Sequence, residues 1–147
     1  MPRLALEFPP EQFFYATQLS VRSTDVNAGQ HLGNDALISM LSEARSLFFY
    51  AHGFEEVPAD GLSWIITDLA AIYRNEAFAR DVLRFDIGLM DFNRYGGDVI
   101  YRVSRPSDGA LIALAKNGFV FFDYFGKKVV PMPETFSRRF PQVNRLD

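Results

Sequence analysis

The chain has 147 residues, close to the commonest size for a single domain, and its acidic and basic residues are dispersed to a formal charge of −3. It has no cysteine, which excludes disulfides, thiolate nucleophiles and thiolate metal ligands, and with only two histidines we expect no metal site. There is no run of 18 apolar residues and no basic stripe. We therefore expect one cytoplasmic domain over residues 1–147 that binds neither nucleic acid nor a membrane.

The first elements are a strand followed by a helix. Alternate residues of 13–21 are apolar or β-branched, which predicts a half-buried strand. Residues 35–52 then place one apolar stripe at helical spacing, with Asn34 as the expected N-cap and Gly53 as the expected C′ residue. The stripe consists of Leu37, Met40, Leu41, Ala44, Phe48 and Ala51.

After Gly61 the period of the pattern changes to that of strands. Four long strands are predicted over 62–74, 81–92, 97–106 and 110–124, with turns at Gly96-Gly97 and at 107–109. The last of these strands is apolar on both faces around Leu114, which is typical of a strand inside a sheet. Residues 131–142 are expected to form a short terminal helix or a loop.

This order of elements predicts an α+β fold: a long curved antiparallel β-sheet of five to six strands wrapped around one central helix. Such a sheet leaves edge strands exposed, and pairing with a second copy of the chain would cover them. We therefore expect a homodimer or a homotetramer.

The loop between the first strand and the helix, SVRSTDVNAGQHLGN, is unusually rich in polar residues and glycine. The loop and helix resemble the hotdog-fold acyl-CoA thioesterases, particularly the 4-hydroxybenzoyl-CoA thioesterase-like branch. That branch reads Arg, two residues, Asp-x-Asp, two residues, Gly-His-Val-Asn-Asn, and then a helix with Glu-Ala-Arg. The matching positions here are Arg22, Asp25, Asn27, Gln30, His31, Leu32, Gly33, Asn34 and Glu43-Ala44-Arg45.

The resemblance implies an enzyme that hydrolyses an acyl-CoA or acyl-carrier-protein thioester, with no cofactor other than the coenzyme A of the substrate. In that branch the second Asp is the usual nucleophile or base, and here its position holds Asn27, which cannot accept a proton as a carboxylate does. The resemblance therefore leaves Asp25 or Glu43 to activate water, with Asn27 orienting the substrate. His31, Gly33 and Asn34 would bind the thioester carbonyl at the helix start. CoA phosphates would favour Lys and Arg near the mouth of the pocket, for which the candidates are Arg74, Arg80, Lys127 and Lys128.

Each of these residues also has a structural interpretation. Asp25 and Asn27 are common in turns, Asn34 in caps, and His31 as a packed, hydrogen-bonded residue before a helix. Glu43 is expected to form an ion pair if it is not the base.

Two other functions stay open. Asp25-Val26-Asn27 with His31 partly resembles the Asp-x-Asn-Pro-x-His signature of hotdog enoyl-CoA hydratases, although the proline is absent. The missing second Asp also suits a non-catalytic acyl-CoA-binding module.

Overall fold

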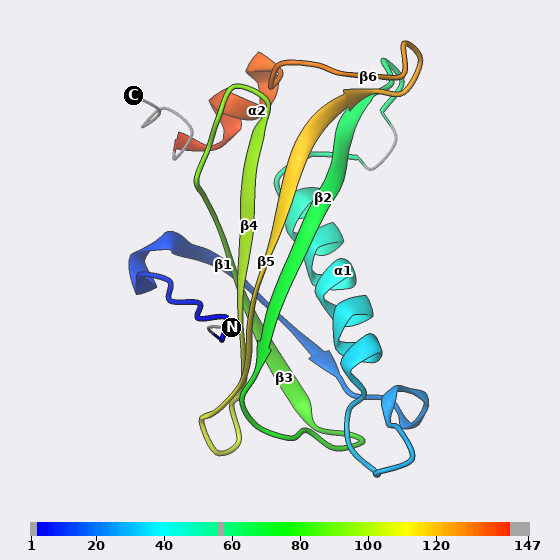
Figure 1. Cartoon of the computed structure of the whole chain (residues 1–147), viewed down its shortest axis with the longest axis vertical. Coiled ribbons are helices and arrows are strands. Elements are labelled where there is room, and N and C mark those ends of the chain that lie inside the picture. Colours follow the sequence, from blue (N-terminus) through cyan, green and yellow to red (C-terminus); the bar gives the residue numbers. More distant parts are fainter. Residues whose placement is uncertain (1–2, 56–57, 142–147) are drawn as a thin grey trace.

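A computed structural model describes residues 3–55 and 58–141, and its largest element is a single curved antiparallel sheet (Figure 1). The strand order is β1-β3-β4-β5-β2, and a short sixth strand, β6, pairs with the end of β5. The strands are β1 (Phe13–Ser20), β2 (Leu62–Tyr73), β3 (Val82–Met90), β4 (Gly96–Arg105), β5 (Ala110–Asp123) and β6 (Lys128–Val129). Two 3₁₀ turns, η1 (Pro10–Gln12) and η2 (Ser23–Asp25), flank β1, and α2 (Glu134–Arg139) follows β6.

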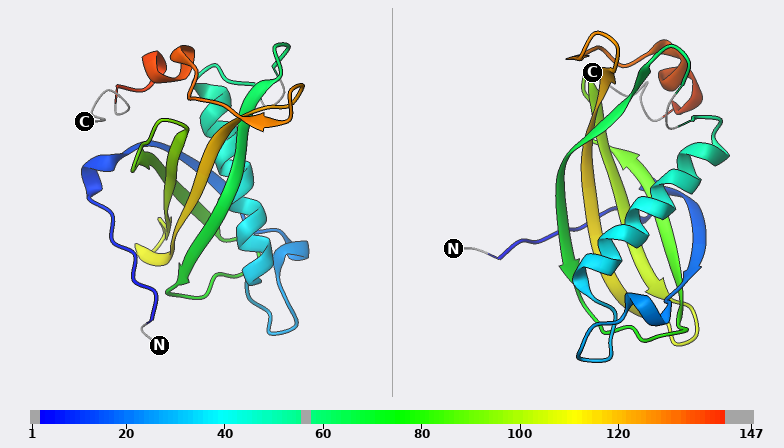
Figure 2. Two further views of the ribbon diagram at one scale, coloured as in Figure 1. Left: turned by 45° about the horizontal axis from the view of Figure 1, so that its top comes forward. Right: turned by 90° about the vertical axis from the view of Figure 1, so that its right-hand side faces the viewer.

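The helix α1 (Asn34–Ala51) lies along the sheet, and the two edge strands β1 and β2 curve around it (Figure 2, right). Its buried residues are Leu37, Met40, Leu41, Ala44, Phe48 and Phe49. Burying each large apolar side chain of this kind contributes about 1.5–3 kcal/mol. The predicted α+β fold, one helix wrapped by a curled sheet, is confirmed.

Most predicted element boundaries agree with the structure to within two residues. Gly53 follows the last helical turn with φ +87°, and the Phe54 N–H bonds back to the Phe49 carbonyl, as in a Schellman motif. One member of the predicted stripe is wrong. Ala51 is exposed, and Phe49 is buried in its place. The Phe49 ring packs against Trp64, with 4.2 Å between the two ring centroids.

Two local predictions need correction. Asn34 is the first helical residue, and Gly33 is the N-cap, so the Asn34 side chain accepts a bond from the Asp35 N–H instead of capping the helix. Gly96 and Gly97 lie inside β4 and form no turn. A Cβ on Gly96 would lie 1.9 Å from the Phe119 carbonyl oxygen, so glycine is needed here for the close approach of β5.

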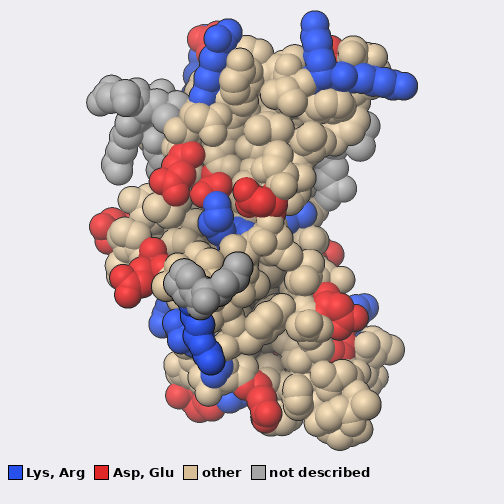
Figure 3. Space-filling view, viewed as in Figure 1, with Lys and Arg blue, Asp and Glu red and all other residues tan. Residues whose placement is uncertain are grey.

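Three further predictions concern the distribution of surface charge, the crossing of a membrane and the number of domains. On the face shown in Figure 3, Lys and Arg side chains lie among Asp and Glu rather than in one continuous stripe. No helix in the described ranges is long and apolar enough to cross a membrane. The predicted single domain, 1–147, includes residues 1–2, 56–57 and 142–147, which lie outside those ranges, and it stays a prediction.

Candidate active site

The polar loop before α1 closes as a small hairpin. Val26 and Leu32 form an isolated β-bridge, and the Asn27 N–H donates to the His31 carbonyl over 2.9 Å. Gln30 takes φ +68° at the tip of the hairpin. The Asn27 side-chain oxygen accepts the Gly29 N–H over 3.0 Å, so Asn27 forms the turn that its residue type favours.

This hairpin is fixed to two neighbouring segments. The Leu32 N–H donates to the carbonyl of Ala77, a buried residue just after β2, over 2.7 Å. The Gly33 N–H donates to the Asp25 carbonyl in η2 over 3.0 Å. The loop is therefore held between η2 and the segment that follows β2, and its polar side chains have a defined surface to face.

That surface is a pocket of about 530 Å³ between the loop, the start of α1 and the end of β2. We call it the first pocket. Four of the six predicted site residues line it: Asn27, His31, Gly33 and Asn34. The other lining residues are Leu32, Leu37, Tyr73, Arg74, Asn75, Glu76, Ala77 and Ile112.

The start of α1 forms one wall of this pocket. The first i→i−4 bond of the helix runs from the Leu37 N–H to the Gly33 carbonyl, so the N–H groups of residues 34–36 precede the helical ladder. Together with the helix dipole, such groups favour a negatively charged or polarised oxygen. A thioester carbonyl placed here would be stabilised as it becomes an oxyanion.

Tyr73, at the end of β2, borders the same wall. Its hydroxyl donates to the Asn34 carbonyl over 3.2 Å, which joins the edge strand to the helix start. Burial, with a further contribution from the Asp35 carboxylate, raises the pKa of the Tyr73 phenol. The phenol therefore stays protonated at neutral pH and acts as a hydrogen-bond donor.

The other two predicted residues, Asp25 and Glu43, line a second pocket of about 470 Å³ with Leu19, Ser20, Arg22, Ser39 and Met40. Glu43 is nine residues after Asn34, which is two and a half helical turns. Glu43 thus lies about 13 Å from Asn34 along the helix axis and on the opposite side of the helix from it. Asp25 and Glu43 therefore line a different pocket from the other four residues, although the Asp25 carbonyl bonds to Gly33, and their catalytic roles stay predictions.

Asp25 is held by Arg22. One carboxylate oxygen accepts the Arg22 backbone N–H over 2.8 Å, and the guanidinium contacts both oxygens at 3.2 and 3.0 Å. These bonds outweigh the effect of burial and lower the pKa of the Asp25 carboxyl. A carboxylate engaged in this way is a weak base, and its geometry is that of a cap on η2.

We expect Asp25→Asn to reduce the free energy of unfolding at pH 7 by about 1 kcal/mol, because the carboxamide offers Arg22 one acceptor oxygen instead of two and carries no charge. Because the folded-state pKa of Asp25 is depressed, its stabilisation is complete above the unfolded value of about 3.9 and disappears as the pH falls through the folded value. Urea unfolding from pH 7 down to pH 3 should show the two proteins converging. A gap that stays constant would show that ionisation of Asp25 contributes nothing.

Residues 73–77 are the part of the first pocket that sequence reasoning did not assign to the site, except that Arg74 was a candidate for contacting CoA phosphates. The sequence feature that could have indicated them is a polar run, Arg74-Asn75-Glu76, directly after a long apolar strand. The Arg74 N–H bonds to the Ile112 carbonyl and the Asn75 side chain to the Leu111 carbonyl, which attaches the run to the start of β5. Among the described residues, no group of three or more acidic, histidine or cysteine side chains is placed to hold a metal.

The fold and the loop at the helix start define a protein of the hotdog class. Three solved or curated relatives support this. The long-chain acyl-CoA thioesterase FadM of Escherichia coli K12 is 23% identical over 128 residues, 86% of this chain and 97% of FadM. The structure of Slr0204, a 1,4-dihydroxy-2-naphthoyl-CoA thioesterase from Synechocystis, superposes with a TM-score of 0.80 at 12% identity, covering 90% of this chain and 98% of Slr0204. The structure of SAV2348 from Staphylococcus aureus, in complex with CoA, superposes with a TM-score of 0.79 at 16% identity, covering 87% of this chain and 82% of SAV2348.

The model of the thioesterase-like superfamily matches residues 21–140. The chain therefore belongs to the thioesterase-like superfamily. The predicted fold and family are confirmed, and with them the predicted class of enzyme, a thioester hydrolase.

Proposed function

We propose that the protein hydrolyses the thioester of an acyl-CoA in the first pocket and releases the free acid and CoA. The observation that carries this proposal is the convergence of the helix start with the polar side chains of Asn27, His31 and Asn34 around one cavity. A thioester carbonyl needs donors aimed at its oxygen, and the helix start supplies them before any substrate arrives. CoA enters as part of the substrate, and the proposal includes no further cofactor.

The lining of the pocket suits the two ends of such a substrate. Leu37, Ala77 and Ile112 form its apolar part, to which an acyl group would pack. Arg74 is exposed at the same pocket, where its guanidinium could contact a CoA phosphate. Acyl carrier protein, the other predicted thioester donor, presents the same thioester on a phosphopantetheine arm and is included in the proposal.

We further propose that two copies of the chain associate through β2. This strand ends the sheet, and Ile66, Leu69 and Tyr73 on it expose 38, 41 and 49% of their surface. A free sheet edge with exposed apolar residues is a typical site of strand pairing. Because Tyr73 also lines the first pocket, a partner seated on β2 would border the site. Analytical ultracentrifugation should give the mass of a dimer or a tetramer, and a monomer at micromolar concentration would contradict this.

The test of the activity is a thiol-release assay over short, long and aromatic acyl-CoAs. We expect Arg74→Ala to raise KM several-fold with little change in kcat, since a phosphate contact is made equally in the ground and transition states. Arg138→Ala is the matched control, because Arg138 is an exposed arginine on α2 that pairs only with Glu134 in the contacts described. Acyl-CoA binding without thiol release on any substrate would contradict hydrolysis.

That negative outcome would instead support the second candidate, a non-catalytic acyl-CoA-binding module. Asn27 favours it, because the position holds a carboxamide where the resembling branch has its working carboxylate. The predicted cytoplasmic location is retained as part of the proposal and is testable by fractionation of cells that express the protein.

A further inference from the structure

Hydrolysis in the first pocket requires a proton acceptor, and the placement of carboxylates restricts the choice. Asp25 and Glu43 line the second pocket, and Asp25 is bonded to Arg22 through both oxygens. Among the described residues that line the first pocket, the one carboxylate is Glu76. It comes from the segment after β2, which sequence reasoning did not assign to the site.

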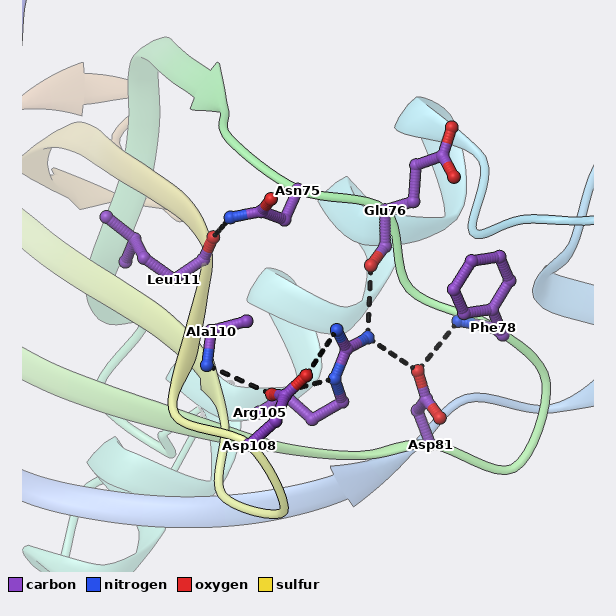
Figure 4. Close-up of polar contacts among 8 residues, drawn as sticks. All are labelled: Asn75, Glu76, Phe78, Asp81, Arg105, Asp108, Ala110 and Leu111. Carbon is purple, nitrogen blue, oxygen red and sulfur yellow. Dashed lines mark hydrogen bonds and ion pairs between the residues drawn. The ribbon is translucent and has the colours of Figure 1, made fainter.

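The main chain of Glu76 is held rigidly although its side chain is exposed. Arg105, on β4, donates to the Glu76 carbonyl over 3.0 Å while it is itself held by Asp81 and Asp108. The next residue, Ala77, accepts the Leu32 N–H of the polar loop. Figure 4 shows the Glu76 carboxylate pointing away from Arg105, so this arginine fixes the backbone and does not neutralise the acid.

The Glu76 carboxylate faces His31. Its Oε1 atom lies 4.0 Å from the His31 Nε2 atom, and the two side chains are 66 and 36% exposed. A Cβ at Gly29 would lie 3.0 Å from the same nitrogen, so the imidazole packs against the turn of the loop at this point. An exposed pair at this distance adds little to stability, but a substrate that excludes water would bring the two groups closer.

We propose, on the basis of the proposed hydrolysis, that His31 is the general base of this site and that Glu76 is its positioning residue. In this arrangement the Nε2–H group of His31 donates to the Glu76 carboxylate, which leaves Nδ1 as the acceptor. Neutral His31 takes a proton from water as the water oxygen bonds to the thioester carbon. The carbonyl electrons move onto the oxygen at the helix start and then return to break the C–S bond. The imidazolium delivers its proton to the departing thiolate, so water and thioester give acid and thiol.

Several charged and titratable groups surround His31 in the first pocket. The charged and titratable groups that line its pocket are Tyr73, Arg74 and Glu76, all from the end of β2 or just after it. Asp35, in the first turn of α1, lies near enough to Tyr73 to affect it. Glu76 is the group that faces the imidazole, with its Oε1 atom 4.0 Å from the His31 Nε2 atom.

The experiment compares His31→Gln, Glu76→Gln and Glu76→Asp with wild type on the best acyl-CoA of the panel. We expect His31→Gln to lower kcat at least 100-fold and Glu76→Gln about tenfold, both with KM within a factor of three. Glu76→Asp should recover most of the kcat lost in Glu76→Gln, because it returns a carboxylate that can accept the Nε2–H group of His31. Glu134→Gln, an exposed acid on α2, is the control and should change none of these.

The outcomes separate this inference from the function on which it rests. Wild-type turnover that survives both His31→Gln and Glu76→Gln would overturn the pair and leave hydrolysis intact. A Glu76→Asp variant that is as slow as Glu76→Gln would overturn the positioning role. Absence of wild-type turnover over the whole panel would overturn both proposals. Thermal unfolding of each variant, expected within about 1 °C of wild type, distinguishes lost chemistry from lost folding.

Discussion

Replacing Asn117 by leucine should reduce the free energy of unfolding by about 3 kcal/mol, the largest loss we expect from a single polar side chain of this protein. Asn117 lies on β5 and is buried. Its side-chain oxygen accepts the Tyr101 hydroxyl over 2.6 Å and the Arg45 guanidinium over 3.0 Å, and its amide donates to the Asp68 carbonyl over 3.1 Å. Leucine of similar size would leave a phenol and a guanidinium without the acceptor that they share.

Urea unfolding at pH 7 measures this loss, with Tyr101→Phe as the matched control. Removing the Tyr101 hydroxyl deletes its bond to Asn117 and the bond that it accepts from Arg45 over 3.2 Å. Because the ring stays and Arg45 keeps the Asn117 oxygen, the cost should be only about 1 kcal/mol. Burial raises the pKa of Tyr101 to about 12, so both differences should be constant from pH 6 to pH 9. If Asn117→Leu costs no more than Tyr101→Phe, the shared oxygen does not hold the network together.

This network determines how the helix sits on the sheet. Arg45 is on α1, Tyr101 on β4 and Asn117 on β5, and the Asp68 carbonyl belongs to β2 beside its irregular register at Ile66–Asp68. One set of polar contacts therefore joins α1 to three strands, with Tyr101 and Asn117 buried and Arg45 partly buried. Because α1 carries the first pocket at its start, we infer that the network also fixes the distance between the helix start and β2.

The sequence predicts the sheet and helix well because each depends on a local period. The alternation over 13–21 and the stripe from Leu37 to Phe48 are visible in consecutive residues. The loop was also recognisable, since its polar residues lie within a few positions of one another. The Arg45 network was not, because its partners are 56 and 72 residues away and Asn117 stands in a strand that otherwise reads as apolar.

The site was predicted only in part, for a similar reason. Asn27, His31, Gly33 and Asn34 come from one segment and share one pocket. The family resemblance assigned Asp25 and Glu43 to the same site, but the turn η2 and two and a half turns of helix direct their side chains to another pocket. Glu76 is 45 positions beyond His31, and only the pairing of β2 with β5 and the Leu32–Ala77 bond bring it to the loop.

The second large effect is expected from Asn27→Asp, which should increase kcat about tenfold in the wild-type background. Asn27 uses its side-chain oxygen to accept the Gly29 N–H over 3.0 Å. A carboxylate can keep this bond with one oxygen and present the other to the first pocket, so the loop should retain its fold. At this position a carboxylate can accept a proton from water, which the carboxamide of Asn27 cannot.

The same substitution tests whether a carboxylate at position 27 can act as the base when the imidazole of His31 is absent. In the His31→Gln background, Asn27→Asp should recover at least tenfold in kcat, because the carboxylate replaces the lost imidazole at the same cavity. Asn34→Asp is the matched control, because it also adds a carboxylate to the pocket, at the first residue of α1. The helix dipole should stabilise this carboxylate, and we do not expect it to lie beside the attacking water. Thiol release and urea unfolding on both variants provide the comparison. If Asn34→Asp recovers turnover equally, negative charge in the pocket is enough and its position does not matter. If Asn27→Asp recovers none, a carboxylate at position 27 does not reach the attacking water. The base is then His31 itself or a group outside this pocket.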